Sequence, residues 1–332
     1  MKRRSKSKRQ KRILSVKRSR SNTKAVESVV VVGSGPAAYT ACIYLGRANL
    51  KPLMLEGVPM NSTSPGGLLM TSHIVENFPG FSKGVEGKDL ISEMKEQASR
   101  AGTRIRSEWV DKITRSSSGL FALHFGKKAI KAKSVIVATG SVPNKLDVPG
   151  FDEFWYKGVS TCAVCDGSLP MFRNQPLAVV GGGDSACEEA LYLANLASKV
   201  YLIHRRDTLR ASKVLQDRVL SHPKITVLWN QEVEEIKGAK TVGSVRLSNR
   251  KGELAVKGVF VAIGHKPGSQ LVEDLVKCDR EGYIEVNDRQ ETSVSGLFAA
   301  GDVQDREFRQ AITAAGSGAK AGISCERWLA TR

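Results

Sequence analysis

Short apolar runs along this chain are each followed directly by a glycine-rich turn. The first run is Val-Val-Val-Val at residues 29–32, which is typical of a parallel strand buried on both faces. The turn Gly-Ser-Gly-Pro-Ala-Ala at residues 33–38 follows at once, and residues 38–46 predict a helix. Residues 50–56 predict the next strand, which ends in an acidic side chain. The pattern therefore predicts a β-α-β unit.

The same succession recurs in the middle of the chain. Residues 177–180 predict a buried strand, and the turn Gly-Gly-Gly-Asp-Ser-Ala at residues 181–186 leads into a helix over residues 185–197. Residues 200–203 predict the following strand. Two such units predict an α/β fold with two Rossmann-like dinucleotide-binding domains.

Two further apolar segments, residues 134–140 and 297–302, predict strands that end at a small residue and a glycine. A glycine at such a place lets the backbone come close to a ligand. Asp302 at the second strand end can accept a hydrogen bond from a ligand hydroxyl. Residues 309–316 predict the start of a helix, whose N-terminus would point at an electron-rich ring system.

The two predicted units differ in the side chains that would meet a ribose. The first ends at Glu56, a little over twenty residues beyond Gly33, where a carboxylate can bind ribose hydroxyls. The second ends at His204-Arg205-Arg206, and an arginine pair binds a 2′-phosphate that a carboxylate would repel. The alternative is that the arginines only form a solvated strand end. We expect the second unit to bind NADP(H) and the first a nucleotide with a free ribose.

The pair Cys162 and Cys165 lies between the two units and can close a small disulfide, with Asp166 behind it as a proton donor. A flavin and a nicotinamide are the natural pair of cofactors for passing electrons to a disulfide. A zinc site is the alternative for a Cys-x-x-Cys pair, but no second pair of cysteines or histidines stands at ligand spacing. The isolated cysteines at 42, 187, 278 and 325 are expected to be buried and inert. His265 is expected either near the nicotinamide or as a structural side chain.

The chain has 332 residues, of which 41% are hydrophobic, so it can bury one large core or two ordinary ones. Its longest apolar runs are too short to span a bilayer, and no apolar run follows the basic N-terminus as in a secretory signal. A single close pair of cysteines fits a reducing compartment. These observations favour a cytoplasmic protein without a membrane anchor.

Most of the net charge of +18 belongs to a tail at residues 1–24, which has twelve basic residues and no acidic ones. A segment with so few apolar residues is expected to be disordered. It is interpreted either as a solvated extension, as a nuclear address or arm that contacts nucleic acid, or as an organelle-targeting segment. The nucleus, a mitochondrion and a plastid are therefore alternative compartments.

From about residue 29 to residue 329, the chain resembles the low-molecular-weight NADPH-dependent thioredoxin reductases, most closely the plant and fungal forms. The motifs that carry the resemblance are Gly-Ser-Gly-Pro-Ala at 33–37, Val-Glu-Asn-Phe-Pro-Gly-Phe at 75–81, Cys-Ala-Val-Cys-Asp-Gly at 162–167, Gly-Gly-Gly-Asp-Ser-Ala at 181–186, His-Arg-Arg-Asp at 204–207, Arg-Ala-Ser at 210–212 and residues 301–318.

The resemblance implies a discontinuous FAD-binding domain at residues 25–142 and 264–332, with an NADPH-binding domain at 143–263 inserted between the two parts. It also implies a homodimer. Because the disulfide lies in the NADPH domain, one domain must rotate against the other during the reaction. We expect the hinges near residues 142–145 and 262–266, with Gly264 and Pro267 in or beside them.

The resemblance also assigns roles to single residues. Cys165 would face the flavin, Cys162 would attack the disulfide of thioredoxin, and Asp166 would be the acid–base residue. The 2′-phosphate of NADPH would meet His204, Arg205, Arg206 and Arg210, and its binding turn would use Gly181, Gly183, Asp184 and Ser185. FAD would contact Ser34, Gly35, Pro36, Ala37, Glu56, Asn77, Val110, Asp302, Arg309, Gln310 and Ala311. The activity implied is thioredoxin-disulfide reduction in cell redox homeostasis.

Three positions depart from the family's pattern. The family's Gly-Gly-Gln is Gly66-Gly67-Leu68 here, so a side chain that commonly hydrogen-bonds the flavin is missing. The threonine-rich run after it is altered, and a position near the C-terminus that is often cysteine is Ala319. We expect bound FAD, at less than full occupancy. The alternatives to the enzyme are a flavoprotein fold that its basic tail docks to nucleic acid, and a related flavoprotein that acts on other dithiols.

Overall fold

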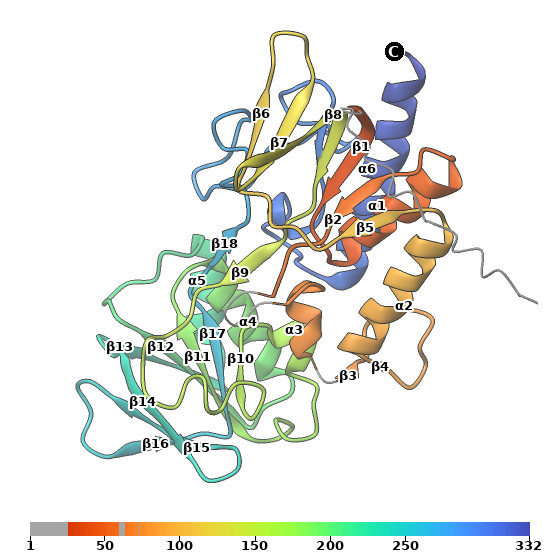
Figure 1. Ribbon diagram of the computed structural model, residues 1–332. Coiled ribbons are helices and arrows are strands. Elements are labelled where there is room, and N and C mark those ends of the chain that lie inside the picture. The colour runs from red at the N-terminus through yellow and green to blue at the C-terminus, as the bar shows by residue number, and fades with distance from the viewer. Residues whose placement is uncertain (1–25, 60–63, 73) are drawn as a thin grey trace, which may run out of the picture.

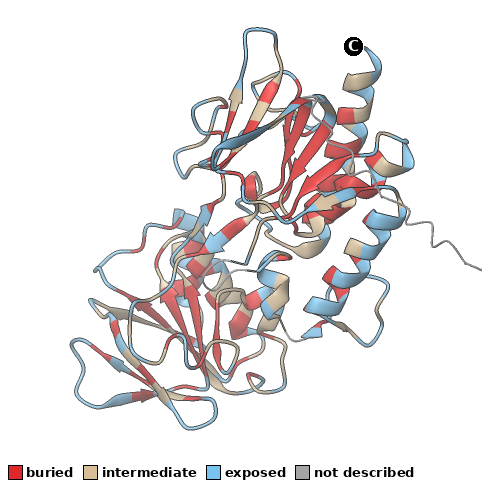
Figure 2. Ribbon diagram, viewed as in Figure 1, coloured by how far each residue is buried: buried red, intermediate tan, exposed pale blue. Residues whose placement is uncertain are grey.

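The computed structural model describes residues 26–59, 64–72 and 74–332, so the predicted basic tail at 1–24 lies outside the described residues. The chain forms two lobes, each built around its own sheet (Figure 1). Strands of the first sheet come from residues 26–137 and 297–299, and strands of the second from residues 159–262. Figure 2 shows that buried residues concentrate in these two sheets and in the helices against them.

The first sheet has seven strands and a mainly parallel centre. Its path runs β5 (Arg104–Arg106), β2 (Leu53–Leu55), β1 (Val26–Val32), β8 (Lys128–Val137), β7 (Phe121–Phe125) and β6 (Lys112–Arg115), with β19 (Leu297–Ala299) paired to β8. Strands β2, β8 and β19 are parallel to their neighbours at the centre, whereas β7 and β6 are antiparallel. The carboxyl ends of β1, β2, β8 and β19 therefore meet at one edge, and the residues after them form the first part of the site.

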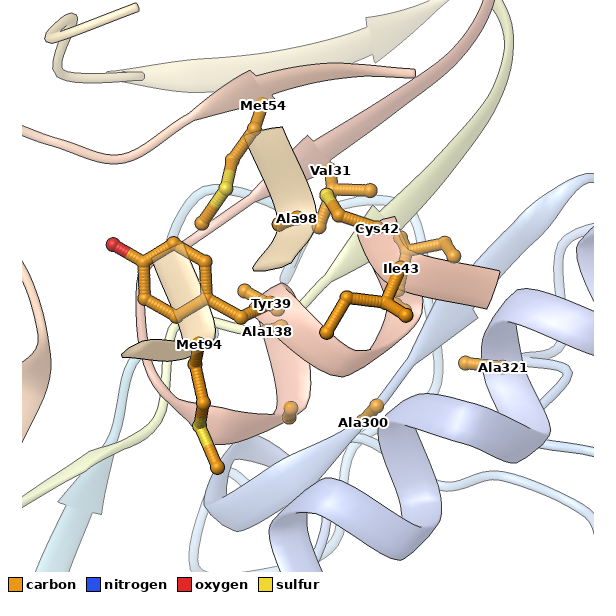
Figure 3. Close-up of a cluster of buried hydrophobic side chains, with 14 of the residues drawn as sticks. Val31, Tyr39, Cys42, Ile43, Met54, Met94, Ala98, Ala138, Ala300 and Ala321 are labelled. Carbon is orange, nitrogen blue, oxygen red and sulfur yellow. The ribbon is translucent and has the colours of Figure 1, made fainter. Parts of the chain in front are cut away.

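Three helices pack on the first sheet: α1 (Pro36–Arg47), α2 (Gly87–Arg100) and α6 (Ala311–Ala330). Tyr39 and Cys42 of α1, Met94 of α2 and Ala321 of α6 meet Met54 of β2 in one buried cluster (Figure 3). Small residues let α1 and α6 approach closely, because a Cβ on Gly318 would lie 2.2 Å from the carbonyl oxygen of Ala37. Shorter elements of this lobe are η1 (Gly67–Thr71), β3 (Ile74–Val75), β4 (Val85–Glu86) and η2 (Gly301–Val303).

The second sheet is parallel throughout, in the order β10 (Val159–Ser160), β17 (Gly258–Ala262), β11 (Pro176–Gly181), β12 (Lys199–His204) and β13 (Ile225–Trp229). Its alternating side chains bury both faces. One face packs with α3 (Ala163–Asp166), α4 (Asp184–Ala194) and α5 (Lys213–Ser221). The other face packs with the antiparallel sheet β14 (Val233–Gly238), β15 (Val242–Leu247) and β16 (Glu253–Ala255).

The chain crosses between the lobes twice, and the two crossings lie side by side. β9 (Ser141–Pro143) pairs antiparallel with β18 (His265–Pro267), and the Asn144 backbone N–H donates to the Gly264 carbonyl at 3.0 Å. Gly264 has a φ of 92°, a conformation that favours glycine. The predicted hinge segments are thus adjacent in space, while their motion stays a prediction.

The predicted elements are present, with shifted ends. The strand predicted from residue 50 begins only at Leu53, and the helix predicted over 185–197 ends at Ala194. The helix expected from residue 309 begins at Ala311, so that prediction was wrong at its start. Arg309 has a φ of 47° and Gln310 is extended, and Gln310 forms a capping box with Thr313.

Candidate active site

The Cys162–Cys165 pair forms a disulfide at the start of α3. Cys162 is the N-cap of this short helix, and the backbone N–H of Cys165 donates to its Sγ at 3.2 Å. A donor aimed at this sulfur stabilises negative charge there once the disulfide is opened. α3 packs tightly against α4, because a Cβ on Gly167 would lie 2.7 Å from a methyl group of Leu193. The disulfide is thus carried by the second lobe.

Asp166 is held directly behind the disulfide by a short polar chain. Its Oδ2 accepts a hydrogen bond from the Ser160 hydroxyl at 2.5 Å, and the Ser160 oxygen accepts one from the Cys162 backbone N–H at 3.1 Å. Ser160 is buried at the end of β10. The sheet therefore fixes both the carboxylate and the first cysteine, and it places a proton-carrying group beside the pair.

The disulfide faces the first lobe through Gln310. The Nε2 atom of Gln310 lies 3.8 Å from the Sγ of Cys162 and 3.9 Å from that of Cys165. The Oε1 atom of the same side chain accepts a hydrogen bond from the Asn77 amide at 3.1 Å. Asn77 and Gln310 are more than two hundred residues apart in sequence, and both were predicted to contact a flavin. They meet at the point where the disulfide meets the first lobe.

The first glycine turn has the geometry of a phosphate cradle. Gly33 has a φ of 127°, and a Cβ on it would lie 2.1 Å from the Ala138 carbonyl oxygen, so only glycine fits. Gly35 has no other atom within 4 Å of such a Cβ, and it is the N-cap of α1 without a side-chain cap. The Ser34 hydroxyl accepts a hydrogen bond from the Gly66 backbone N–H at 2.9 Å. The free N–H groups of this helix start fit the pyrophosphate of a dinucleotide.

Other predicted flavin contacts lie at the same edge of the sheet. Buried Glu56 follows β2, where its carboxylate accepts hydrogen bonds from Lys95 at 2.7 Å and Ser107 at 2.8 Å. Asp302 follows β19, and burial, aided by the charge of Asp305, raises the pKa of its carboxyl to about 7. The remaining predicted residues are Pro36 and Ala37 in the first turn of α1, Ala311 at the start of α6, Arg309 just before it, and Val110, which is buried in the core.

The second glycine turn repeats the design of the first in the second lobe. Gly181 has a φ of 155°, and a Cβ there would lie 2.4 Å from the Ala262 carbonyl oxygen. Gly183 is in open space and is the N-cap of α4, with Asp184 and Ser185 in its first turn. The Asp184 carboxylate accepts a hydrogen bond from the Ser212 backbone N–H at 2.8 Å. These contacts leave the helix start open to an anion.

The structure separates the four residues predicted at the 2′-phosphate. Arg205, Arg206 and Arg210 are exposed, and the Arg210 backbone N–H donates to the Gly182 carbonyl at 2.7 Å, which places this loop against the glycine turn. His204 is buried, and its Nε2 donates to the Thr208 carbonyl at 2.9 Å. A Cβ on Gly182 would lie 2.2 Å from the histidine ring, so only glycine leaves room for the ring. The His204 ring therefore packs directly against the glycine turn.

Several side chains of the site carried no local sequence signal. Lys95 and Ser107 reach Glu56 from far along the chain, and Ser160 reaches Asp166 from the preceding strand. Tyr156, with a φ of 58°, bonds the Thr71 hydroxyl of the first lobe at 3.0 Å through its own hydroxyl. Glu189 of α4 lies against α3. Only the fold brings these groups together.

The remaining cysteines stand apart from the site. Cys42, Cys187 and Cys325 are buried, and Cys278 is partly buried. Burial raises the pKa of the Cys42 and Cys325 thiols to about 12 and that of Cys187 to about 11, so these groups are poor nucleophiles. Burial also lowers the pKa of His265, in β18, to about 4. Within residues 26–59, 64–72 and 74–332, no cluster of three or more His, Cys, Asp or Glu side chains could hold a metal ion.

Comparison with known proteins accounts for this pair of glycine turns around a disulfide. Residues 27–318 match the family described as pyridine nucleotide-disulphide oxidoreductase. The chain belongs to that family. It is 48% identical over 312 residues to a thioredoxin reductase of Debaryomyces hansenii, covering 91% of this chain and 97% of that protein. It is 49% identical to the mitochondrial thioredoxin reductase 1 of Arabidopsis thaliana, covering 90% of this chain and 83% of that one.

Solved structures agree with the family assignment. A thioredoxin reductase from Streptococcus pyogenes has a TM-score of 0.84 at 38% identity, covering 93% of this chain and all of that one. A Lactococcus lactis thioredoxin reductase in the FR conformation has a TM-score of only 0.61 at 37% identity, covering 92% of this chain and all of that one. The two relatives are thus nearly equally identical to this chain, but the second superposes on it much less well as a whole.

Proposed function

We propose that this protein is a thioredoxin-disulfide reductase that works in cell redox homeostasis. The observation that carries the proposal is the Cys162–Cys165 disulfide, which the second lobe holds against Asn77 and Gln310 of the first. Two curated relatives that are 48% identical to this chain and cover 91% of it are named thioredoxin reductase. The intact pair, with Asp166 behind it, favours catalysis over a purely structural flavoprotein role.

Two cofactors, FAD and NADPH, support this activity. FAD is proposed to bind at the edge of the first sheet. Its contacts would be the start of α1 with Ser34, Gly35, Pro36 and Ala37, together with Glu56, Asn77, Val110, Asp302 and the segment from Arg309 to Ala311. A bound flavin supplies the two-electron chemistry that links hydride donation by NADPH to reduction of the disulfide. The buried carboxyls at the strand ends fit neutral hydrogen-bonding partners such as ribose and ribityl hydroxyls.

The second glycine turn is proposed to bind NADPH, with Gly181, Gly183, Asp184 and Ser185 at its pyrophosphate. We assign the 2′-phosphate to Arg205, Arg206 and Arg210, which are exposed beside the turn. His204, whose Nε2 is already engaged by Thr208, would act there by supporting the turn. The name of one Arabidopsis thaliana relative, NADPH-dependent thioredoxin reductase 3, is consistent with this cofactor.

The two cysteines are proposed to have different tasks. After reduction of the pair, the Cys162 thiolate attacks one sulfur of the thioredoxin disulfide, which forms a mixed disulfide and releases a thioredoxin thiolate. The Cys165 thiolate then attacks the Cys162 sulfur, which restores the internal disulfide and releases the second thioredoxin thiolate. Asp166 supplies a proton to the departing sulfur. The Cys165 N–H that points at Cys162 favours the thiolate on Cys162.

We also propose that the lobes act as domains, with an FAD domain at 25–142 and 264–332 and an NADPH domain at 143–263, which rotate about β9 and β18. In the present arrangement Cys162 is partly buried, with Gln310 of the first lobe 3.8 Å from its Sγ, and a rotation of the lobes would free this sulfur for thioredoxin. The low TM-score to a relative in the FR conformation is consistent with a second arrangement.

The proposed assembly is a homodimer whose partner protein is thioredoxin. None of the helices in the described part of the chain has the length and apolar character of a membrane span. We propose the cytoplasm as its compartment; relatives include a mitochondrial form, and the basic tail that would decide between compartments, or contact nucleic acid, lies outside the described residues.

A trapping experiment tests the proposal. Cys165→Ser leaves Cys162 without its resolving partner, so oxidised thioredoxin should accumulate on Cys162 as a stable mixed disulfide. Cys162→Ser should trap none, and Cys278→Ser, which changes a thiol outside the site, should behave as wild type. Trapping at Cys165 instead would reverse the assignment of the sulfurs. If no variant traps thioredoxin and the wild type reduces none, the proposed function fails.

A further inference from the structure

The carboxyl of Glu189 lies against the redox-active helix, although the mechanism above does not use it. Glu189 stands on α4, on the side that packs against α3. Its carboxyl accepts a hydrogen bond from the backbone N–H of Ala163, the residue between Cys162 and Val164 in the disulfide loop. The other oxygen, Oε2, is buried and has no hydrogen-bond partner among the described residues. A carboxyl in this position is close to both the helix start and the sulfur pair.

The charged groups around Glu189 have opposite effects on the ionisation of its carboxyl. Asp166 of α3 and Glu188 of α4 disfavour a second negative charge, whereas Arg309, from the segment before α6 in the other lobe, favours it. The Ala163 N–H also favours the ionised form. Burial outweighs these attractions and raises the pKa of Glu189 to about 8. The group is therefore mostly neutral at pH 7 and becomes charged as the pH rises through about 8.

We propose that Glu189 is a positioning residue of the redox centre, which holds the start of α3 through Ala163 and, by binding or releasing one proton, sets the charge that a newly formed thiolate encounters. This inference rests on Cys162–Cys165 being the exchanging disulfide. Reduction places negative charge on a sulfur next to Ala163. A neutral Glu189 permits that charge, while an ionised one opposes it. By reciprocity, a thiolate makes Glu189 hold its proton more tightly.

The test measures the equilibrium of the holoenzyme's disulfide with a dithiothreitol buffer between pH 7 and 9.5. Samples are quenched with an alkylating reagent, and the reduced fraction is read from the mass of the Cys162–Cys165 peptide. For Glu189→Gln, which stays neutral, the equilibrium constant for reduction relative to wild type should rise about three- to tenfold over this range, since one pKa unit of coupling is tenfold. Glu232→Gln, an exposed site in the same lobe, should give a constant ratio.

A ratio for Glu189→Gln that stays constant with pH would overturn the proposal, because a purely structural role changes the constant equally at all pH values. Should Glu189→Gln lose its FAD or native circular dichroism, Glu189→Met, a neutral side chain that buries no polar atom, is judged by the same criterion. The measurement uses neither NADPH nor thioredoxin. Its failure is therefore distinguishable from failure of the proposed function, in which dithiothreitol exchange would continue but thioredoxin would not be reduced.

Discussion

Leu68 stands where the resemblance to the reductase family leads us to expect a glutamine that hydrogen-bonds the flavin. It lies in η1 and is 40% exposed, two residues after Gly66, whose backbone N–H donates to the Ser34 hydroxyl. The leucine side chain has no hydrogen-bonding group, so it cannot replace the amide that the family's pattern has here. Binding of FAD should therefore be weaker than a glutamine at this position would allow.

Replacing Leu68 with glutamine should restore one hydrogen bond. The dissociation constant for FAD is expected to fall about two- to tenfold, since a neutral hydrogen bond contributes about 0.5–1.5 kcal/mol. Isothermal titration of flavin-stripped protein measures the change. Leu220→Gln, at an exposed leucine of α5, serves as the control and should leave FAD binding unchanged. An unchanged or higher constant for Leu68→Gln would mean that the position does not face the flavin.

Arg205 and Arg206 should decide the choice between NADPH and NADH. Removing both as alanines is expected to raise KM for NADPH about 100-fold or more, because hydrogen bonds to charged groups contribute about 1.5–3 kcal/mol each. KM for NADH should stay within about twofold, since it lacks the 2′-phosphate. Steady-state kinetics with both nucleotides measures this, with Arg250→Ala, an exposed arginine of the same lobe, as the control. Equal losses with both nucleotides would place the 2′-phosphate elsewhere.

For single residues, the sequence could predict those whose role depends only on residues close to them in the sequence. The Cys162–Cys165 spacing and the glycines at 33 and 181 are local requirements, so they could be recognised. Glu56 could be predicted from its place after a strand, and its cofactor role stays a prediction, but its partners Lys95 and Ser107 could not be foreseen, because they come from distant elements. The burial of His204 beneath Gly182 was equally hidden, since exposure depends on the packing of the whole loop.

At the level of elements, the turn between β1 and α1 has glycine at positions 33 and 35 for two different reasons. Gly33 is needed by the fold, since its φ is positive and a Cβ would collide with Ala138. Gly35 is in open space with an ordinary φ of −84°, so nothing in the protein itself requires glycine there. We therefore expect that glycine is needed at position 35 to leave room for the ligand.

Alanine substitutions at Gly33 and Gly35 should affect different properties, the first stability and the second FAD binding. Gly33→Ala should lower the free energy of unfolding by about 2–4 kcal/mol through strain and overlap. Gly35→Ala should change it by less than about 0.5 kcal/mol, yet weaken FAD binding by about tenfold or more. Urea unfolding of the flavin-free protein and FAD titration provide the two readings. A Gly35→Ala protein that binds FAD as tightly as wild type would refute the cradle.

Element type was predictable here, whereas element ends were not. Apolar runs before Gly33 and Gly181 specify buried strands, and both are central in their sheets. The start of α6 was misplaced because Arg309 adopts a left-handed conformation that its residue type does not signal. That bend turns Gln310 toward the disulfide, so the error fell on a residue of the site.

At the scale of the whole molecule, polar side chains of the described residues join the two lobes. The Gln310 amide lies beside the disulfide, and the Tyr156 hydroxyl bonds the Thr71 hydroxyl of η1. Tyr156 has a left-handed backbone, which is unfavourable for an aromatic residue and is maintained by its surroundings. Polar contacts suit an interface that, as proposed, opens during each cycle.

Tyr156→Phe removes the hydroxyl pair and should favour the alternative arrangement of the lobes. The Tyr156 hydroxyl bonds both Thr71 and Ser72 of the first lobe, so its loss, at about 0.5–1.5 kcal/mol for each bond, should raise the population of that arrangement at least about twofold. Fluorescence energy transfer between labels at Glu96→Cys and Glu234→Cys, two exposed positions on different lobes, would report the shift in oxidised protein with Cys278→Ser. Tyr201→Phe is the matched control. An unchanged transfer efficiency would show that the Tyr156 hydroxyl does not hold the lobes together.

The central claim is that electrons from NADPH leave the protein through Cys162 and Cys165. The most direct measurement is an anaerobic count of thioredoxin thiols formed per NADPH consumed. The account predicts two thiols per NADPH for the wild type. It predicts none for Cys162→Ser, in which NADPH should still bleach the flavin absorption. Thiols formed by Cys162→Ser at the wild-type rate, or none formed by the wild type, would contradict it.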